Sequence, residues 1–226
     1  MRVIFNEELK AVADDLDRMA QDVRKAINGA GDALLNQNLE AAQAVIDGDI
    51  EIDALESSVI DQCVKLLAKQ NPVATDLRVV VSTLRLAATF ERMGDLARHI
   101  AEAARRTYPA SPPPADAQPL FAEMQAFLDN VADQVVSMLT DRDTKTAEQI
   151  ILNDDKLDAL HKKTFELAQS EDWKGTNQQL IDVVLTGRFM ERLGDHAVSA
   201  ARRVVFIVSG FDPSKEPTRD EGTDID

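Results

Sequence analysis

Apolar residues recur at alternating spacings of four and three along the first part of the chain. This spacing places them on one side of a helix and is typical of the narrow seam of a helical bundle. The positions are Phe5, Leu9, Val12, Leu16, Met19, Val23 and Ile27. The sequence Asn28-Gly29-Ala30-Gly31 then predicts the end of this helix.

Three further helices are expected before the midpoint. A short helix over residues 34–46 is predicted to break at Gly48, and another over residues 49–69 to close at Pro72, because the residue before a proline disfavours helical geometry. Thr75 or Asp76 is the expected cap of a long helix that reaches about residue 106.

A proline-rich segment at residues 108–119 divides the chain and holds five of its eight prolines. We expect a stiff, extended linker there. A second helical pattern follows, with one helix striped by Leu120, Met124, Phe127, Val131, Val135 and Met138. Further helices are expected over residues 144–169 and 177–209, ahead of a tail rich in Pro, Asp, Glu and Thr.

The second half of the chain repeats short segments of the first. Residues 46–55 (IDGDIEIDAL) return as 151–160 (ILNDDKLDAL), and residues 91–97 (ERMGDLA) return as 191–197 (ERLGDHA). The sequence therefore predicts an all-α protein of two tandem, similar helical bundles. The expected boundaries are 1–107 for the first repeat, 108–119 for the linker, 120–209 for the second repeat and 210–226 for an acidic, disordered tail.

The formal net charge is −15, with 40 acidic and 25 basic residues. Such a field repels nucleic acid and anionic lipid, and suits cations or a basic patch on another protein. It is equally explained as an aid to solubility. Cys63 is the only cysteine, and its apolar neighbours indicate a buried, inert thiol. With neither a signal peptide nor a membrane span in the pattern, the expected location is cytoplasmic.

Each repeat carries two acid-x-x-x-acid pairs, one on its middle helix and one on its long last helix. Residues four apart share a helical face, so each pair sets two like charges side by side and needs a compensating partner. The pairs are Asp49/Asp53 and Glu91/Asp95 in the first repeat, and Asp154/Asp158 and Glu191/Asp195 in the second.

On the last helices these acids continue a line of apolar residues, which predicts that they face the core. The line is formed by Leu77, Val81, Leu84, Ala88, Glu91 and Asp95 in the first repeat and by Leu180, Val184, Glu191 and Asp195 in the second. Arg188 falls close to this line, and its pairing stays open at this stage. Gly94 and Gly194 lack a side chain beside the acids, so another helix or a ligand can approach closely. A buried, unpaired carboxylate is costly, so such groups bind cations, pair or stay protonated.

Two readings of the eight acids remain. Carboxylate-rich sites suit hard cations such as magnesium, manganese and iron, and zinc stays open. The alternative is a structural polar network in which the acids pair with Arg92 and Arg192. A ferritin-like di-metal centre needs two Glu-x-x-His pairs, and the nearest approach is Asp158 with His161, so redox catalysis is disfavoured.

The doubled motif Glu-Arg-(Met/Leu)-Gly-Asp-(Leu/His)-Ala, with Asp76-Leu77-Arg78 and the Asp-rich segments before it, resembles the PhoU family over essentially the whole chain except the tail. The resemblance implies two tandem three-helix bundles. It implies multinuclear metal clusters of iron or zinc, with ligands at the eight paired acids, and His196 and Asp76 as candidates for additional ligands. Leu96 stands where the second repeat has His196, so the two sites are expected to differ.

The resemblance also implies a function. PhoU-like proteins are negative regulators of phosphate uptake and phosphate-starvation signalling. The chain is therefore expected to be a non-enzymatic adaptor between a phosphate ABC transporter and a sensor histidine kinase, at the cytoplasmic membrane face and as a homodimer. The alternatives are a carboxylate-bridged metal-binding protein or metalloenzyme with an iron-storage or redox role, and a helical scaffold that holds no metal.

Overall fold

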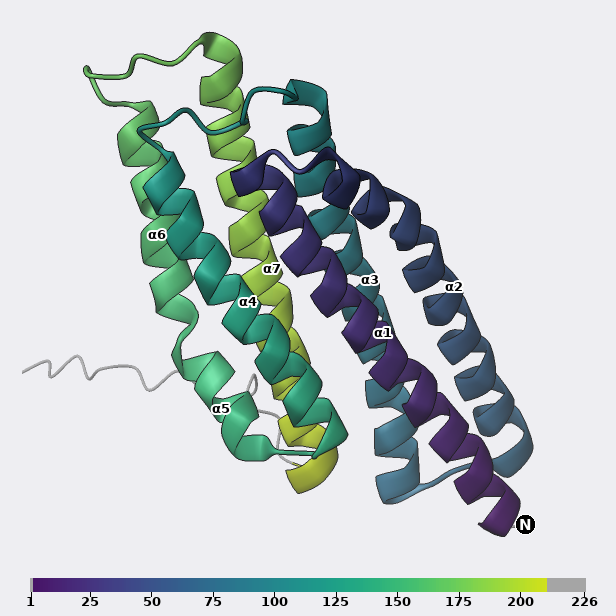
Figure 1. The fold of residues 1–226 in the computed structure, drawn as a ribbon. Coiled ribbons are helices and arrows are strands. Elements are labelled where there is room, and N and C mark those ends of the chain that lie inside the picture. The colour runs from purple at the N-terminus through teal and green to yellow at the C-terminus, as the bar shows by residue number, and fades with distance from the viewer. Residues whose placement is uncertain (1, 211–226) are drawn as a thin grey trace, which may run out of the picture.

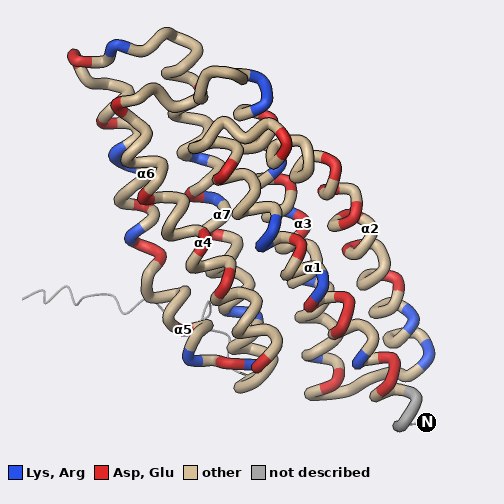
Figure 2. Tube along the Cα trace, in the orientation of Figure 1, with Lys and Arg blue, Asp and Glu red and all other residues tan. Residues whose placement is uncertain are grey.

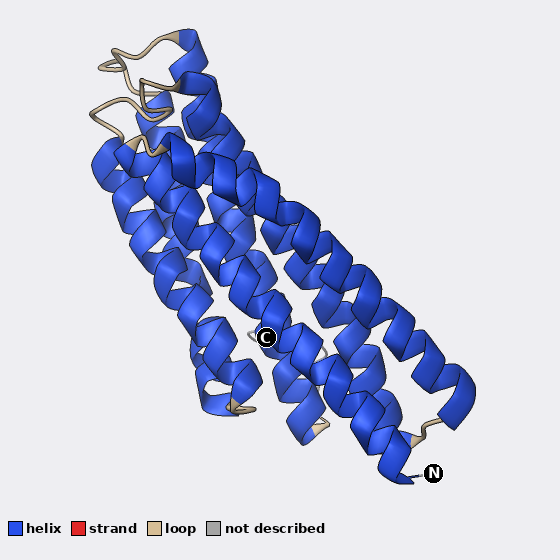
Figure 3. Ribbon diagram, turned by 45° about the vertical axis from the view of Figure 1, so that its right-hand side comes forward, coloured by secondary structure: helices blue, strands red, loops and turns tan. Residues whose placement is uncertain are grey.

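The fold is described for residues 2–210 of a computed structural model, and the predicted tail beyond Gly210 lies outside the described residues. Seven helices and their connecting loops make up this part of the chain, without any strand (Figure 3). Their bounds are α1 Arg2–Asn36, α2 Leu39–Gln70, α3 Ala74–Thr107, α4 Gln118–Thr140, α5 Thr144–Leu152, α6 Asp154–Ala168 and α7 Asn177–Ser209. The predicted all-helical class is confirmed.

The helices form two bundles of three rods. In the first bundle α1, α2 and α3 all pack against one another, and in the second α4 and α7 pack with the broken rod α5–α6. The helices α2 and α5–α6 lie at opposite outer edges, while α1 meets α4 and α3 meets α7 in the middle (Figure 1). The tandem three-helix arrangement is therefore confirmed.

The helices α3 and α7 run antiparallel along the seam between the bundles. At one end the buried carboxylate of Asp182, near the start of α7, accepts a hydrogen bond from Arg106, near the end of α3. At the other end Arg78, near the start of α3, donates to the carbonyl of Ile207, near the end of α7. This seam puts the long last helices of both repeats side by side.

The predicted end of the first helix at residues 28–31 is wrong, because α1 continues to Asn36. A Cβ on Gly31 would lie 2.1 Å from the side chain of Gln125 on α4, and a Cβ on Gly29 would lie 2.7 Å from Val45 on α2. These glycines make room for neighbouring helices instead of ending the helix.

The predicted break at Gly48 is also wrong, because α2 is one helix from Leu39 to Gln70. Its buried stripe runs through Val45, Ile52, Val59, Cys63 and Leu66, so tertiary packing continues across the glycine. Its predicted end before Pro72 is confirmed.

The predicted helix over residues 144–169 is divided at Asn153 into α5 and α6. The side-chain amide of Asn153 donates to the carbonyl of Gln149 at 2.8 Å, and such local bonds compete with the helical ladder. The cap of α3 differs too: Val73 precedes the helix without a side-chain bond, in place of Thr75 or Asp76. The helix predicted over residues 177–209 matches α7 and begins at a capping box of Thr176 and Gln179.

The proline-rich segment is not the extended linker that its composition predicts. Residues 108–117 form successive turns, in which Pro112 and Pro113 are buried. The hydroxyl of Ser111 donates to the carbonyl of Leu34 on α1 at 3.0 Å. The connection is therefore packed against the helical body.

Cys63 is fully buried, as expected, and burial raises the pKa of its thiol to about 11. Within residues 2–210, no helix combines the length and the apolar character needed to cross a membrane.

Candidate metal centres

The four acids predicted in the first repeat meet across the seam between α2 and α3, and we call them the first acidic cluster. Asp49 and Asp53 come from α2, and Glu91 and Asp95 come from α3. Asp49 is buried, Asp53 is exposed, and the two α3 acids are half-buried. The charges of Asp53 and Asp95 act on both Asp49 and Glu91 and contribute to raising the pKa of each.

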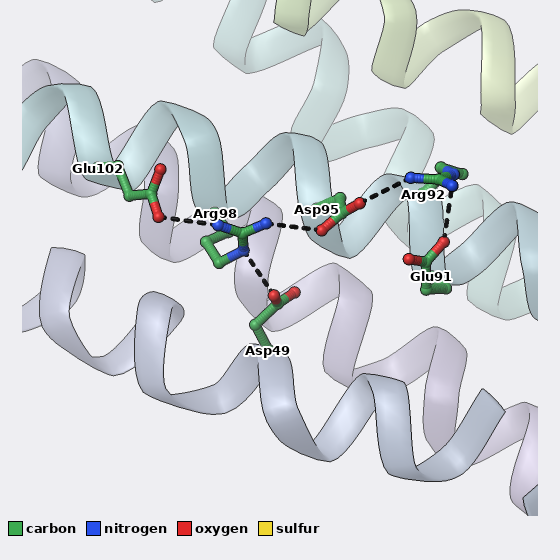
Figure 4. A network of polar contacts seen from close by, with 6 residues as sticks. All are labelled: Asp49, Glu91, Arg92, Asp95, Arg98 and Glu102. Atoms are coloured by element: carbon green, nitrogen blue, oxygen red, sulfur yellow. Dashed lines mark hydrogen bonds and ion pairs between the residues drawn. The ribbon is translucent and has the colours of Figure 1, made fainter. Parts of the chain in front are cut away.

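Arg98 pairs with two acids of this cluster and with Glu102. Its Nε lies 2.6 Å from Oδ2 of Asp49, and its two terminal nitrogens lie 2.8 Å from Asp95 and 2.8 Å from Glu102. Arg92 completes the chain of contacts, 3.0 Å from Asp95 and 3.4 Å from Glu91 (Figure 4). A single guanidinium thus bridges three carboxylates from two helices.

The pKa values of these acids follow from burial and from the two arginines. Burial raises the pKa of Asp49, and Arg98 only partly offsets it. Burial, with the charge of Asp95, raises the pKa of Glu91. Burial also acts to raise the pKa of Asp95, but the hydrogen bond and charge of Arg98 outweigh it and leave that pKa below its usual value. The position of Arg98 therefore sets which carboxylate is most firmly ionised.

The second acidic cluster lies at the seam between α6 and α7 and consists of Asp154, Asp158, Glu191 and Asp195. One oxygen from each of the three aspartates lies within 4.8 Å of the others. No other such trio of Asp, Glu, His or Cys side chains occurs in the described part of the chain. Burial raises the pKa of Asp154, and the charges of Asp158 and Asp195 add to the rise.

Glu191 is buried beside this trio and has its own cation. Both of its carboxylate oxygens lie 2.5 Å from Nη1 of Arg188, so the pairing left open by the sequence is settled. Burial and the charge of Asp195 nevertheless raise the pKa of Glu191. The arginine contacts Glu191 from the solvent side and makes no ion pair with the trio.

The two clusters differ at the position of Arg98. The offset of the repeated motif places Val198 where the first repeat has Arg98, and Val198 is buried. The second cluster thus has three close carboxylates that no arginine bridges, whereas the first has a guanidinium between them. A hard cation fits the aspartate trio, because oxygen ligands at this spacing can converge on one ion. In the first cluster Arg98 takes the place that such a cation would occupy.

The two motif glycines let the helices of each cluster approach closely. A Cβ on Gly94 would lie 3.0 Å from Ile52 and 3.3 Å from the carboxylate of Asp49, and a Cβ on Gly194 would lie 2.6 Å from Leu157. The expected close approach therefore comes from a neighbouring helix in both repeats.

The prediction that the acids continue a core-facing line is wrong for α3. Leu77 and Val81 are 41% and 39% exposed, and Ala88 is also exposed. The core face lies about one residue earlier along the helix than the predicted line, and it includes Val80, Phe90 and Met93. Most of the acids sit at the margin of the core, on the surface, and only Asp49 and Glu191 are buried.

The two additional ligand candidates, Asp76 and His196, differ from the eight acids in position. Asp76 is exposed in the first turn of α3, about 22 Å along the helix from Glu91 at 1.5 Å per residue. His196 is half-buried beside Asp195, but it stands outside the aspartate trio. Burial and the charge of Arg192 lower its pKa.

Arg98 and Glu102 are the cluster residues that sequence reasoning missed. The signal was available: Arg98 follows Asp95 by three residues and precedes Glu102 by four, which are the spacings of helical ion pairs. Aligning the two repeats would also have set Arg98 against Val198.

The fold and the paired clusters define a class of protein: a duplicated three-helix bundle with an acidic seam in each half. The sequence pattern described as PhoU domain matches this chain twice, at residues 16–104 and 121–204. The chain therefore belongs to the PhoU family.

Known proteins resemble the chain over nearly its full length. It is 35% identical over 216 residues to the "Phosphate-specific transport system accessory protein PhoU homolog 1" of Mycobacterium leprae, covering 96% of this chain and 97% of that protein. It is 36% identical over 213 residues to the PhoU homolog 2 of Mycobacterium tuberculosis, covering 94% and 100%. The crystal structure of PhoU from Pseudomonas aeruginosa matches with a TM-score of 0.83 at 26% identity, covering 92% of this chain and 100% of that one. PhoU from Streptococcus pneumoniae shares the fold, with a TM-score of 0.81 at 21% identity and coverage of 92% and 98%.

Proposed function

We propose that this protein is an accessory regulator of a phosphate-specific transport system. In this role it represses phosphate uptake and phosphate-starvation signalling and catalyses no reaction. The observation that carries the proposal is the match of both repeats to the PhoU domain, together with relatives named as accessory proteins of phosphate-specific transport that align over 94–96% of the chain.

The proposal includes metal binding at the acidic clusters. The second acidic cluster is the stronger site, because its three aspartate oxygens converge and Val198 supplies no competing charge. Iron or zinc is the expected ion, with manganese and magnesium as alternatives. The first acidic cluster binds metal only if Arg98 moves away from Asp49 and Asp95, so its affinity is lower.

Regulation requires contact with other proteins, for which we propose the transporter subunits at the cytoplasmic membrane face, a sensor histidine kinase and a second copy of this chain. Exposed apolar side chains on the two seam helices support a docking role. Leu77 and Val81 on α3, and Ile181 and Leu185 on α7, are 39–48% exposed. The outer helices α2 and α6 carry charged residues of both signs along their length (Figure 2). Exposed apolar side chains grouped among charged surfaces are typical of a protein interaction site.

Gene deletion with complementation tests the regulatory role, and elemental analysis tests metal binding. Deleting the gene should raise phosphate uptake and starvation-gene expression at high external phosphate, and the wild-type gene should restore repression. The triple variant Asp154→Asn, Asp158→Asn, Asp195→Asn should fail to restore it. The variant Asp155→Asn, an exposed neighbour outside the trio, is the matched control and should restore it fully.

Elemental analysis of protein purified without chelator or affinity tag separates the parts of the proposal. Stoichiometric metal that is lost in the triple variant supports the metal centre. Normal repression by a metal-free triple variant would show that repression does not need the metal, and absence of metal from the wild-type protein would reject the metal centre; both results leave the regulatory role intact. Unchanged phosphate uptake in the deletion strain would reject the regulatory role, and iron that cycles between oxidation states would favour a storage or redox protein.

A further inference from the structure

A small hollow on the α3–α7 seam is basic, although the protein as a whole is strongly acidic. Its volume is about 320 Å³, and it lies at the surface between the two repeats. We call it the arginine groove. It is lined by Arg85, Ala88, Thr89, Ser199, Arg202 and Arg203.

The lining of the arginine groove is positively charged, whereas the chain as a whole is negatively charged. Acidic residues outnumber basic ones by 40 to 25, yet three of the six lining residues are arginines and none is acidic. The antiparallel seam produces this grouping, because it sets the first half of α3 beside the last half of α7. The arginines therefore come from both repeats and meet only in the folded chain.

Two of these arginines form no ion pair in the part of the chain that the structure describes. Within residues 2–210, neither Arg85 nor Arg202 has an acidic oxygen at ion-pair distance, although most other arginines near the clusters do. Arg85 is exposed and Arg202 is half-buried, so each guanidinium keeps donors available to a ligand.

The hydroxyl groups narrow the kind of ligand. Thr89 donates its proton to the carbonyl of Arg85 at 2.8 Å, so its oxygen can only accept a further bond. Ser199 is exposed, and its hydroxyl has no hydrogen-bond partner among residues 2–210, so it can donate to an anion. The set of available donors is guanidinium nitrogens and one hydroxyl, which matches an oxyanion with several acceptor oxygens.

We propose that the arginine groove binds a phosphate-type oxyanion, either as the free ion or as the terminal phosphoryl group of a nucleotide. Guanidinium forks bind such oxygens in bidentate fashion, and a hollow of this size lies at the small end of ligand sites, roughly 300 Å³ and above. The site goes beyond the proposed regulatory function, because it gives the chain a direct contact with phosphate that is independent of the acidic clusters.

The groove lies within electrostatic reach of the second acidic cluster. Burial raises the pKa of Asp154, and Arg202 is the positive group that opposes the rise. Metal bound at that cluster could itself hold phosphate, so the binding measurement has to be made on metal-free protein.

The test is isothermal titration of metal-free, full-length protein with orthophosphate and, separately, with ATP, against chloride at matched ionic strength. The double variant Arg85→Gln, Arg202→Gln should bind at least tenfold more weakly. Arg18→Gln removes the same kind of charge from an exposed position on α1, and it should change the affinity less than twofold. Binding of orthophosphate assigns the free ion, and binding of ATP alone assigns a phosphorylated molecule.

A second variant guards against a folding defect. Ala88→Glu places a carboxylate in the groove at an exposed helical position, keeps all three arginines and should abolish binding. Circular dichroism should show unchanged helicity in every variant. The proposal is overturned if neither anion binds above the chloride background, or if Arg18→Gln weakens binding as much as the double variant does.

Discussion

Arg98 and Asp49 join α3 to α2 through an ion pair whose Nε and Oδ2 atoms lie 2.6 Å apart. The second repeat has Val198 at the position of Arg98 and therefore lacks this pair. One acidic seam therefore has a guanidinium between two of its aspartates, whereas in the other Arg188 pairs with Glu191 and not with the aspartate trio. The two halves share a fold and differ in electrostatics.

Replacing Arg98 by valine should make the first repeat resemble the second. In metal-free protein the free energy of unfolding should fall by about 1–3 kcal/mol, because Asp49 stays buried without its partner. Metal uptake at the first acidic cluster should rise. Urea denaturation and elemental analysis measure the two effects.

Arg92→Val is the matched control, because Arg92 is 63% exposed and its pairs contribute less than about 1 kcal/mol. Equal loss of stability in both variants would contradict a special role for Arg98.

Alanine at Gly194 should destabilise the protein, whereas alanine at Gly48 should stabilise it. A Cβ on Gly194 would lie 2.6 Å from Leu157, and overpacking of this kind costs about 1–3 kcal/mol. No atom of the described residues lies within 4 Å of a Cβ on Gly48, so alanine there should raise the free energy of unfolding by about 0.5–1 kcal/mol. Urea denaturation of both variants measures the two changes in the free energy of unfolding. An alanine at Gly194 that leaves the protein as stable as the wild type would show that the contact with Leu157 adjusts without cost.

The thiol of Cys63 should resist modification until the protein unfolds. Its pKa is raised from 9.0 to about 11, so the reactive thiolate is about a hundredfold rarer than in an ordinary thiol at the same pH. Labelling with a disulfide reagent at pH 8 should be slow in buffer and fast in urea. Fast labelling of the native protein would place Cys63 at the surface, against its complete burial.

In metal-free protein the four acids with raised pKa values should add stability as the pH falls from neutrality toward the ordinary carboxylate pKa values. Burial raises the pKa of Asp49, Glu91, Asp154 and Glu191, so the folded state binds protons more tightly than the unfolded chain does. Their contribution is present below the ordinary values of 3.8 for Asp and 4.5 for Glu, and it is lost as the pH rises through the raised values.

Urea denaturation at several pH values measures this slope. The variant Asp154→Asn, Glu191→Gln should gain less stability on acidification than the wild type does, because two of the titrating groups are absent. The lowered pKa values of Asp95, His161 and His196 act in the opposite direction in both proteins, so the difference between the two proteins is the quantity to compare. The same pH dependence in both proteins would contradict the expected protonation of the clusters.

The sequence predicts the helices that pack by regular periodicity, and it fails where glycine has a packing role. The stripe of α7 and the end of α2 before Pro72 depend on local signals. Gly31 looks like a helix end in the sequence, but its meaning depends on Gln125, which lies on another repeat. The residues next to Gly31 in the sequence therefore cannot predict that contact.

The same limit applies to the clusters. Repetition predicted the four acids of each seam, and the structure brings each set together. The burial of the α3 acids was misjudged, because Leu77 and Val81 have apolar side chains on an exposed face. The role of Arg98 depends on Asp49, which is 49 residues away, so the sequence offers only indirect signals: the helical neighbours Asp95 and Glu102, and Val198 at the matching position of the second repeat.

The packed connection between the repeats has a consequence for cooperativity. Pro112 and Pro113 are buried, Ser111 is bonded to α1, and the α3–α7 and α1–α4 contacts join the bundles along their length. Neither repeat can lose its structure without exposing the shared seam to water. The chain should therefore melt as one unit, and a ligand that binds either half should raise the melting temperature of both.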